Sequence, residues 1–275
     1  MKPDIITAAF FSPTGGTGNV SAAIADGIAD RFDMAPCRLD LTLPEARTGD
    51  LEFAAGDLVV FGLPTYAGRI PNVLLPWLTA QIHGGGALAL PVVTYGNRNY
   101  DDSLIELRDL LEAAGFHTVG GAAFSCEHSF SRVLGRGRPD SADMEAAEAF
   151  SEIIADRIKA LDRPPTEPAA VTGHSPIRPY YTPRDRAGEP INILKVKPLV
   201  DPDKCVNCGT CARVCPMGSI DPADINIYTG ICIKCGACTK RCPAGARYYD
   251  DPGYLYHLSE LEQQYAGIRR APELF

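Results

Sequence analysis

Several features that would place a protein in a common class are missing from these 275 residues. The chain has no run of about 18 apolar residues, so we expect no membrane-spanning helix. Its first residues, 1–5, show no basic segment followed by an apolar stretch, so we expect no secretory signal peptide. No clustered basic face is evident, which argues against a nucleic-acid partner. These absences favour a cytoplasmic protein.

Charge is distributed unevenly along the chain. Acidic residues outnumber basic ones by 34 to 26, and the formal net charge is −8. The excess lies in residues 1–160, which hold 21 acidic and 12 basic side chains, whereas residues 161–275 hold 13 and 14. The first part is therefore an acidic domain. Length alone predicts about two domains, and the apolar fraction of 45% allows a complete core.

Eight of the ten cysteines form two blocks that repeat with a period of 27 residues. Each block has the spacing C-x2-C-x2-C-x3-C-P. The first block contains Cys205, Cys208, Cys211 and Cys215, and the second contains Cys232, Cys235, Cys238 and Cys242. A repeat that keeps four cysteines and a proline in phase indicates an internal duplication. So many free thiols fit a reducing compartment better than a disulfide scaffold.

This spacing resembles that of bacterial ferredoxins with two [4Fe–4S] clusters. In that pattern three cysteines of a block hold one cluster, and the fourth ligates the other cluster. The resemblance implies one ligand set of Cys205, Cys208, Cys211 and Cys242, and another of Cys232, Cys235, Cys238 and Cys215. Zinc is the alternative metal, because paired C-x-x-C is also a zinc spacing. Zinc sites use two separated pairs of thiolates, however, so the triplets favour iron–sulfur clusters.

Residues 1–161 alternate between short apolar runs and amphipathic segments, which predicts a parallel, doubly wound α/β sheet. We expect strands at 4–11, 35–41, 57–63, 87–93 and 116–126, and helices at 20–32, 71–82, 101–114 and 142–161. Five such strands suggest the order 2-1-3-4-5, with ligands bound at the carboxyl ends of the strands.

Hydroxyl groups and glycines fill the loop at residues 12–19, between the first strand and its helix. Helix N-terminal amides and the helix dipole make such a loop a phosphate site. The loop is not a Walker A motif and shows no clear G-x-G-x-x-G. It matches [ST]-x-T-G-x-T, the FMN-phosphate loop of flavodoxins, through Ser12, Thr14, Gly15 and Thr17, with Gly16 between them. An ordinary capped turn is the alternative.

Two further loops leave the carboxyl ends of predicted strands and combine aromatic residues with glycines. One contains Pro64, Thr65, Tyr66, Ala67 and Gly68, and the other contains Thr94, Tyr95, Gly96, Asn97 and Tyr100. They are similar to the flavin-ring loops of flavodoxins. The resemblance implies that Tyr66 and Tyr100 stack on the ring and that the neighbouring residues contact it. His128, after the last strand, either faces the flavin or satisfies a local loop, as such histidines more often do.

Composition changes after residue 161, where prolines recur and apolar periodicity is lost. We expect a flavodoxin-like FMN domain at 1–161, a semi-rigid Pro-rich linker at 162–196, a small α+β ferredoxin domain of the dicluster type at 197–252, and a helix with a tail at 253–275. The end of the tail is apolar, so we expect it to dock on the flavodoxin-like domain.

The whole chain resembles the flavodoxin–ferredoxin fusion proteins of anaerobic bacteria and archaea. The resemblance implies an electron-transfer protein that carries FMN and two [4Fe–4S] clusters and exchanges electrons with protein donors and acceptors. FMN takes one or two electrons and each cluster takes one, so the protein would convert between one-electron and two-electron steps.

Two other functions stay open. A flavin-dependent reductase of a small oxidised substrate is the main alternative, with His128 and Arg98 as the only hints of a placed acid. A redox sensor is less favoured, because no spare segment exists for an output module. The sequence favours an electron carrier over a substrate-specific enzyme without deciding between them. A homodimer is also possible, because the long linker permits exchange of domains between two copies.

Overall fold

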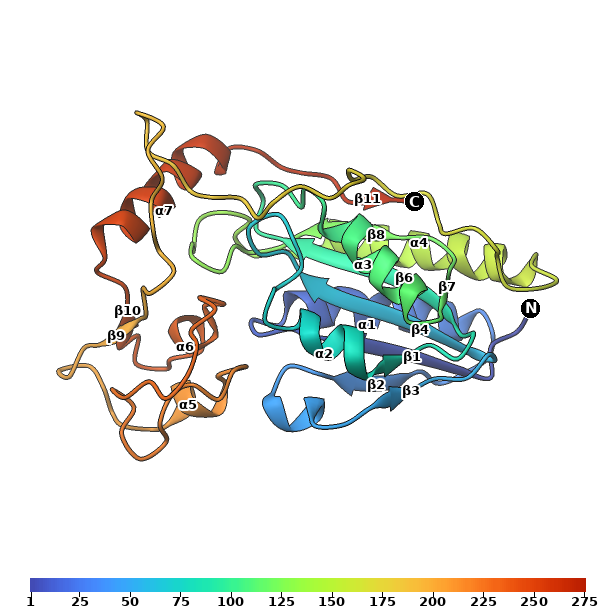
Figure 1. Cartoon of the computed structure of the whole chain (residues 1–275), viewed down its shortest axis with the longest axis horizontal. Helices are drawn as coiled ribbons and strands as arrows, with labels where there is room; N and C mark the ends of the chain where they lie inside the picture. The colour runs from blue at the N-terminus through green and yellow to red at the C-terminus, as the bar shows by residue number, and fades with distance from the viewer.

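The computed structural model describes all 275 residues and contains two bodies of different size. Residues 1–161 form a layered α/β body around a parallel sheet, and residues 197–252 form a smaller body with little regular secondary structure (Figure 1). A connecting segment runs from the larger body to the smaller one, and the C-terminal residues return to the larger body.

Five parallel strands, in the order β2-β1-β4-β6-β8, form the central part of a seven-stranded sheet. They are β1 (Ile5–Phe10), β2 (Cys37–Asp40), β4 (Asp57–Pro64), β6 (Leu88–Tyr95) and β8 (Ala122–Ser125). When these five strands are numbered in the order in which they occur along the chain, the sheet order is 2-1-3-4-5. The predicted doubly wound fold is therefore confirmed. The central strands β4 and β6 are almost wholly buried, because helices cover both faces of the sheet.

The last predicted strand, at 116–126, is divided in the structure. β7 (His117–Thr118) pairs with the start of β6, and β8 pairs with its end. Gly120 and Gly121 separate the two pieces, because a glycine has no side chain to pack and weakens a strand. Gly121 also exchanges backbone hydrogen bonds with Phe275 at the end of the chain. The C-terminus thus lies beside the start of β8, on the edge opposite β6.

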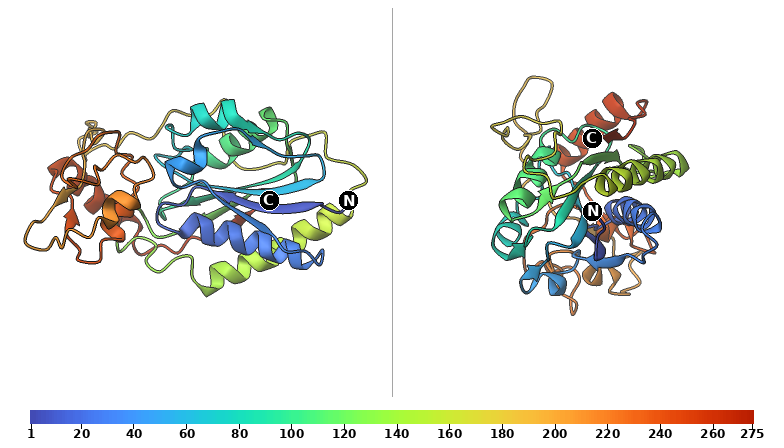
Figure 2. Two further views of the ribbon diagram at one scale, coloured as in Figure 1. Left: turned by 90° about the horizontal axis from the view of Figure 1, so that it is seen from below. Right: turned by 90° about the vertical axis from the view of Figure 1, so that its right-hand side faces the viewer.

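Two helices cover each face of the sheet (Figure 2). On one face lie α1 (Gly16–Asp30) and α4 (Ser141–Lys159), and on the other lie α2 (Leu75–Gln81) and α3 (Ser103–Ala113). α4 begins with a reciprocal cap, in which Asp140 and Asp143 each accept a hydrogen bond from the other's amide. α2 begins later than predicted, because a turn from Pro71 to Leu74 precedes it. The minor elements of this body are the 3-10 helix η1 (Pro44–Arg47) and the parallel pair β3 (Leu51–Glu52) and β5 (Ile82–His83).

The smaller body is built on the sequence repeat. Its regular elements are the antiparallel strands β9 (Leu199–Val200) and β10 (Arg247–Tyr248) and the one-turn helices α5 (Thr210–Arg213) and α6 (Ala237–Lys240). Equivalent residues of the two halves share their backbone conformation. Asn207 and Lys234 have φ angles of 51° and 55°, and Gly209 and Gly236 have 70° and 77°. The duplication indicated by the sequence is therefore visible in the fold.

The connecting segment is fixed to the larger body rather than free. Asp102, whose side chain is buried, accepts hydrogen bonds from Arg178 and from the amide of His174. Burial alone would raise the pKa of Asp102, but the hydrogen bonds from Arg178 and His174 outweigh it and hold the pKa well below its usual range. The hydroxyl of Tyr180 donates to the carbonyl of Ile70 at 2.8 Å.

The C-terminal residues also return to the larger body. α7 (Pro252–Tyr265) leads to β11 (Glu273–Leu274), which pairs antiparallel with β8 at the edge of the sheet. The side chain of Asn97 donates to the carbonyls of Tyr265 and Ile268, at 3.0 and 2.8 Å. The expected docking of the tail is confirmed. None of the helices combines the length and the apolar surface needed to cross a membrane.

Candidate cofactor and metal sites

The loop after β1 is shaped by its own hydroxyl groups. Gly15 has a φ of 101°, a left-handed conformation that glycine adopts without strain, and α1 begins directly after it. Ser12 Oγ accepts a hydrogen bond from the amide of Gly18 at 2.8 Å, and Thr17 Oγ1 lies 2.6 Å from Thr94 Oγ1. The first amides of α1 have no partner within the helix, so this loop can bind an anion.

A pocket at the carboxyl ends of the central strands brings the three predicted loops together. Nine predicted residues line it: Thr14, Gly16, Thr17, Pro64, Thr65, Tyr66, Thr94, Tyr95 and Gly96. Ser12 and Gly15 shape the phosphate loop from behind and do not line the pocket. The arrangement suits a ligand that places an anionic group at α1 and a planar group beside Tyr66.

An adjoining cavity of about 210 Å³ extends this pocket. The two share Thr65, Tyr66, His128 and Ser129. Residues from the connecting segment and the smaller body close the cavity, among them Tyr181 and Lys234, and Ala67 lies here rather than in the first pocket. Both bodies therefore contribute to the space beside Tyr66.

Three predicted ring contacts lie outside the pocket. Tyr100 is buried in the core, with its ring centroid 5.5 Å from that of Tyr95, and its hydroxyl donates to Glu273 at 2.6 Å. It cannot stack on a ligand in the pocket, so that prediction is wrong. Asn97 is buried and uses its side-chain amide to hold the residues after α7. Gly68 faces Asp101, whose carboxylate would lie 2.4 Å from a Cβ at this position. Loop spacing does not tell which way a side chain points.

The loop after β8 supplies a fourth wall of the pocket, and His128 is the one residue of this loop that the sequence predicts as a possible neighbour of the flavin. Cys126, Glu127, His128 and Ser129 all line the pocket. His128 Nδ1 accepts a hydrogen bond from the amide of Phe130 at 3.0 Å, which leaves the ring proton on Nε2. Burial, with the charges of Lys240 and His257, lowers the pKa of His128 to about 3. The imidazole is therefore neutral and offers an N–H donor.

The eight cysteines of the repeat lie around two cavities. One is lined by Cys215, Cys232, Cys235 and Cys238, and the other by Cys205, Cys208, Cys211 and Cys242. We call the first the inner site and the second the outer site. Each site takes three cysteines from one block and the fourth from the other, which is the partition that the ferredoxin resemblance implies.

The surroundings of these thiols fit a thiolate-bound cluster. Burial raises the pKa of Cys235 to about 12, and a bound iron would deprotonate such a thiol outright. Each site also has one backbone amide directed at the sulfur of its crossing cysteine. The amide of Ser219 lies 3.4 Å from Cys215 Sγ, and that of Ala246 lies 3.3 Å from Cys242 Sγ. Such bonds stabilise the charge of a cluster.

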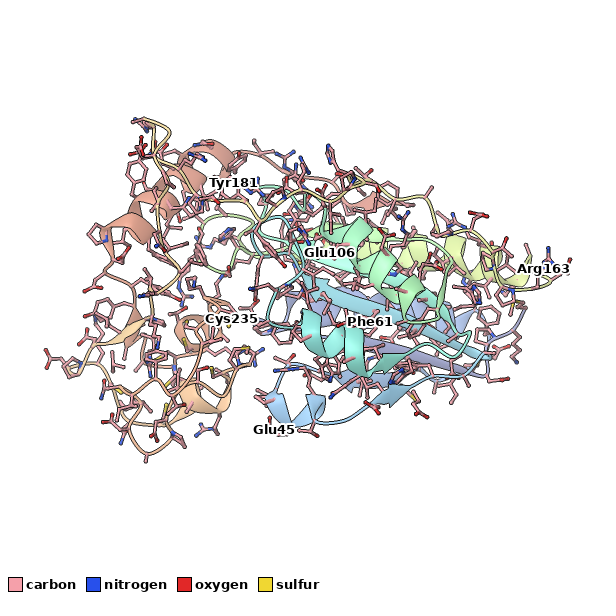
Figure 3. The ribbon with its side chains drawn as sticks, in the orientation of Figure 1. Glu45, Phe61, Glu106, Arg163, Tyr181 and Cys235 are labelled. Carbon is pink, nitrogen blue, oxygen red and sulfur yellow. The ribbon has the colours of Figure 1, made fainter.

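Cys235 belongs to the pocket and to the inner site at once. It lines both cavities and lies on the side of the smaller body that faces the sheet (Figure 3). The next residue, Gly236, packs against Ser129 so closely that a Cβ would lie 2.3 Å from its carbonyl oxygen. Lys240 of α6 donates to the carbonyl of Ser131 at 2.9 Å and to the carboxylate of Glu127. The two bodies are therefore docked at the pocket, within one chain.

Comparison with known protein families separates the two bodies. Residues 197–220 and residues 225–248 each match a family model described as a 4Fe-4S binding domain. The smaller body is a ferredoxin-type domain with two 4Fe–4S sites. Each match contains one complete cysteine block, so the ferredoxin-type domain consists of the two halves of the repeat. No curated protein matches the chain.

Solved structures similar to the larger body are mainly flavodoxins. A flavodoxin from Streptococcus pneumoniae TIGR4 has 17% identity and a TM-score of 0.40, and the match covers 56% of this chain and 99% of that one. The two-electron reduced flavodoxin of Megasphaera elsdenii has 15% identity and a TM-score of 0.36, with 55% and 99% covered. A flavodiiron core from Synechocystis has 18% identity and a TM-score of 0.38, with 56% and 36% covered. The strand order and the helix layers of this chain identify its flavodoxin-like domain.

Proposed function

We propose that the protein transfers electrons between FMN, bound in the pocket of the flavodoxin-like domain, and two [4Fe–4S] clusters in the ferredoxin-type domain. One observation carries the proposal: Cys235 lines the pocket and the inner site together. A cluster held by Cys235 is a direct neighbour of a ligand in the pocket, so no free carrier is needed between them. No residue of the flavodoxin-like domain lines the outer site, which supports a relay in which the outer cluster comes second.

FMN suits the pocket better than FAD does. The loop at residues 12–19 shows no clear G-x-G-x-x-G, the fingerprint by which dinucleotides are bound. Thr14 and Thr17 would hold the phosphate together with the first amides of α1. When bound, FMN supplies both one-electron and two-electron chemistry.

Two of the side chains that line the place of the flavin ring are neutral. Burial, followed by the nearby thiols of Cys235 and Cys232, raises the pKa of Tyr66 well above its usual value. Tyr66 therefore stays a neutral phenol between the pocket and the inner site, and His128 stays a neutral imidazole. Neither takes up or releases a proton near neutral pH, so these two walls hold the ligand without changing their own charge.

Protein donors and acceptors would meet the outer site. Cys208 is exposed, and Val206 beside it is 69% exposed, so a partner can approach this cluster closely. The ferredoxin-type domain contacts its own flavodoxin-like domain, so a homodimer is compatible with the relay and is not required for it. A cytoplasmic location would keep the thiols and clusters in a reducing medium.

A reductase of a small oxidised substrate is the second candidate function. The observation that favours it is a cavity of about 710 Å³ between the connecting segment and the ferredoxin-type domain. Tyr66 and the inner-site residue Cys232 both line this cavity. A substrate there would lie beside both redox sites, whereas a pure electron carrier needs no such space.

An electron count tests the proposal directly. Anaerobically purified protein should contain about eight irons, and coulometric titration should take up about four electrons per chain: two for FMN and one for each cluster. Protein stripped of flavin should take up about two. Zinc in place of iron, or a total of about two electrons in the intact protein, would contradict the proposal. Rapid oxidation of the reduced protein by a small organic oxidant, saturating with its concentration, would favour the reductase.

A further inference from the structure

Arg247 is a buried cation with no acidic partner. Its residue is 5% exposed, and none of the ion pairs in the structure includes it. Its guanidinium donates to the sulfur of Cys211 at 3.2 Å, to the hydroxyl of Tyr228 at 3.1 Å and to the carbonyl of Ile225. A buried charge is costly unless an opposite charge compensates it. Here the sulfur of Cys211 at the outer site is the thiol to which Arg247 is hydrogen-bonded, and the inner-site thiol of Cys238 lies within its electrostatic reach without such a bond.

The internal repeat provides a built-in comparison for Arg247. The residue 27 positions earlier is Ile220, which is 3% exposed and occupies the equivalent place beside the inner site. A second difference lies at Thr210, whose Oγ1 is 3.3 Å from Cys208 Sγ, because its counterpart in the other half is Ala237. The outer site therefore has two polar side chains hydrogen-bonded to its sulfurs, Arg247 as a donor to Cys211 and Thr210 as the partner of Cys208, where the inner site has alkyl groups.

Other polar groups occur near both sites, although their cations do not occupy equivalent positions of the repeat. Each site has one backbone amide on its crossing sulfur, as described above. Each also has one cation directed at a backbone carbonyl rather than at sulfur. Lys234 donates to the carbonyl of Cys232 at 3.2 Å, and Arg213 donates to that of Cys208 at 2.9 Å. Arg247 and Thr210 are thus the features that distinguish the outer site.

We propose that Arg247, assisted by Thr210, raises the reduction potential of the outer cluster above that of the inner cluster. Reduction adds negative charge to a cluster, and a buried cation with an N–H bond to sulfur stabilises that charge. Electrons that leave the flavin through the inner cluster therefore collect at the outer one, next to the exposed Cys208. This inference rests on the proposed function, because it concerns the two clusters of the relay.

The test measures both cluster potentials in the complete protein. An EPR-monitored redox titration of the wild type should show two separate reduction waves, one for each cluster. In Arg247→Met the separation between these two waves should become smaller. We expect the equilibrium constant for electron transfer from the inner to the outer cluster to fall at least tenfold. A tenfold change corresponds to about 59 mV for one electron. An unchanged or wider separation in Arg247→Met, or a single wave in the wild type, would overturn the proposal.

Two further variants keep the test decisive. Lys204→Met removes an exposed cation next to Cys205 that pairs with Asp201, and it should leave both waves in place. Should Arg247→Met fail to assemble its clusters, Thr210→Val and Arg247→Lys decide instead, and each should narrow the separation by less than Arg247→Met would. Iron content separates the two questions: fewer than about eight irons in the wild type speaks against the proposed function, whereas full iron with unmoved waves speaks against the role of Arg247 alone.

Discussion

Hydroxyl groups, rather than cations, define the phosphate loop of the flavodoxin-like domain. Thr14 and Thr17 line the pocket, whereas Ser12 caps the amide of Gly18. No lysine or arginine lies within residues 12–19. Within the loop, binding of FMN therefore depends on amides and hydroxyls.

Removal of the two threonine hydroxyls should weaken FMN binding. The double variant Thr14→Ala with Thr17→Ala loses two donors to a charged group, each worth roughly 1.5–3 kcal/mol. Fluorescence titration of the apoprotein with FMN measures the loss. Thr79→Ala, which removes an exposed hydroxyl in α2, is the control and should bind FMN normally. Wild-type affinity in the double variant would argue that the phosphate lies elsewhere.

The crossing cysteines make a separate prediction at the level of single residues. Cys242 lies in the second block but lines the outer site, so Cys242→Ser should damage the outer cluster and spare the inner one. Iron content should fall from about eight to about four. Cys37→Ser, an exposed cysteine outside the repeat, should keep full iron. Loss of the inner cluster with an intact outer one would show that each block holds its own cluster.

At the scale of elements, the sequence predicted the central strands of the sheet, but it did not predict the strand at the sheet edge. Buried strands such as β4 and β6 have continuous apolar runs, and such runs identify a strand wherever it lies in a parallel sheet. β11 has no such signal, because Glu273–Leu274 becomes a strand only by pairing with β8. The break in the last strand depends on the same tertiary contact, since Gly121 bonds to Phe275.

The same distinction holds for the pocket: features that depend on chain order were predictable, and features that depend on tertiary contacts were not. Loops at strand ends were predictable from chain order, whereas the direction of Tyr100 was not, because its hydroxyl points to Glu273, far along the sequence. The role of Cys235 as a pocket residue was also outside the reach of the sequence. It depends on how α6 packs against Ser129 and Ser131, which spacing within the cysteine repeat does not specify.

α6 also ends beside the phosphate loop, which yields a prediction about Arg241. This exposed residue follows α6, and its Nη2 lies 4.0 Å from where a Gly15 Cβ would be. Arg241→Gln should weaken FMN by roughly 1 kcal/mol or less, because an exposed charge pair contributes little. Riboflavin, which lacks the phosphate, should bind the wild type and Arg241→Gln with equal affinity. Added salt should reduce the difference in FMN affinity between the two proteins. If Arg241→Gln lost equal affinity for FMN and for riboflavin, the substitution would have disturbed the contact between the two domains instead.

At the scale of the whole molecule, one chain holds its two redox domains together at three places. Asp102 fixes the connecting segment, Lys240 joins α6 to the loop after β8, and Asn97 holds the residues after α7. The ferredoxin-type domain is thus kept at the pocket instead of drifting on a linker. In the proposed relay, such tethering would make electron exchange an event within one molecule, independent of how often two molecules collide.

The rate of flavin–cluster exchange tests this account most directly. The protein is mixed rapidly with a reductant that reaches the clusters first, and flavin absorbance is followed over a wide range of protein concentration. The account predicts a flavin phase whose rate constant does not change with protein concentration. A rate that rises in proportion to protein concentration would show that the domains exchange electrons only through collisions between molecules, and it would contradict the built-in relay.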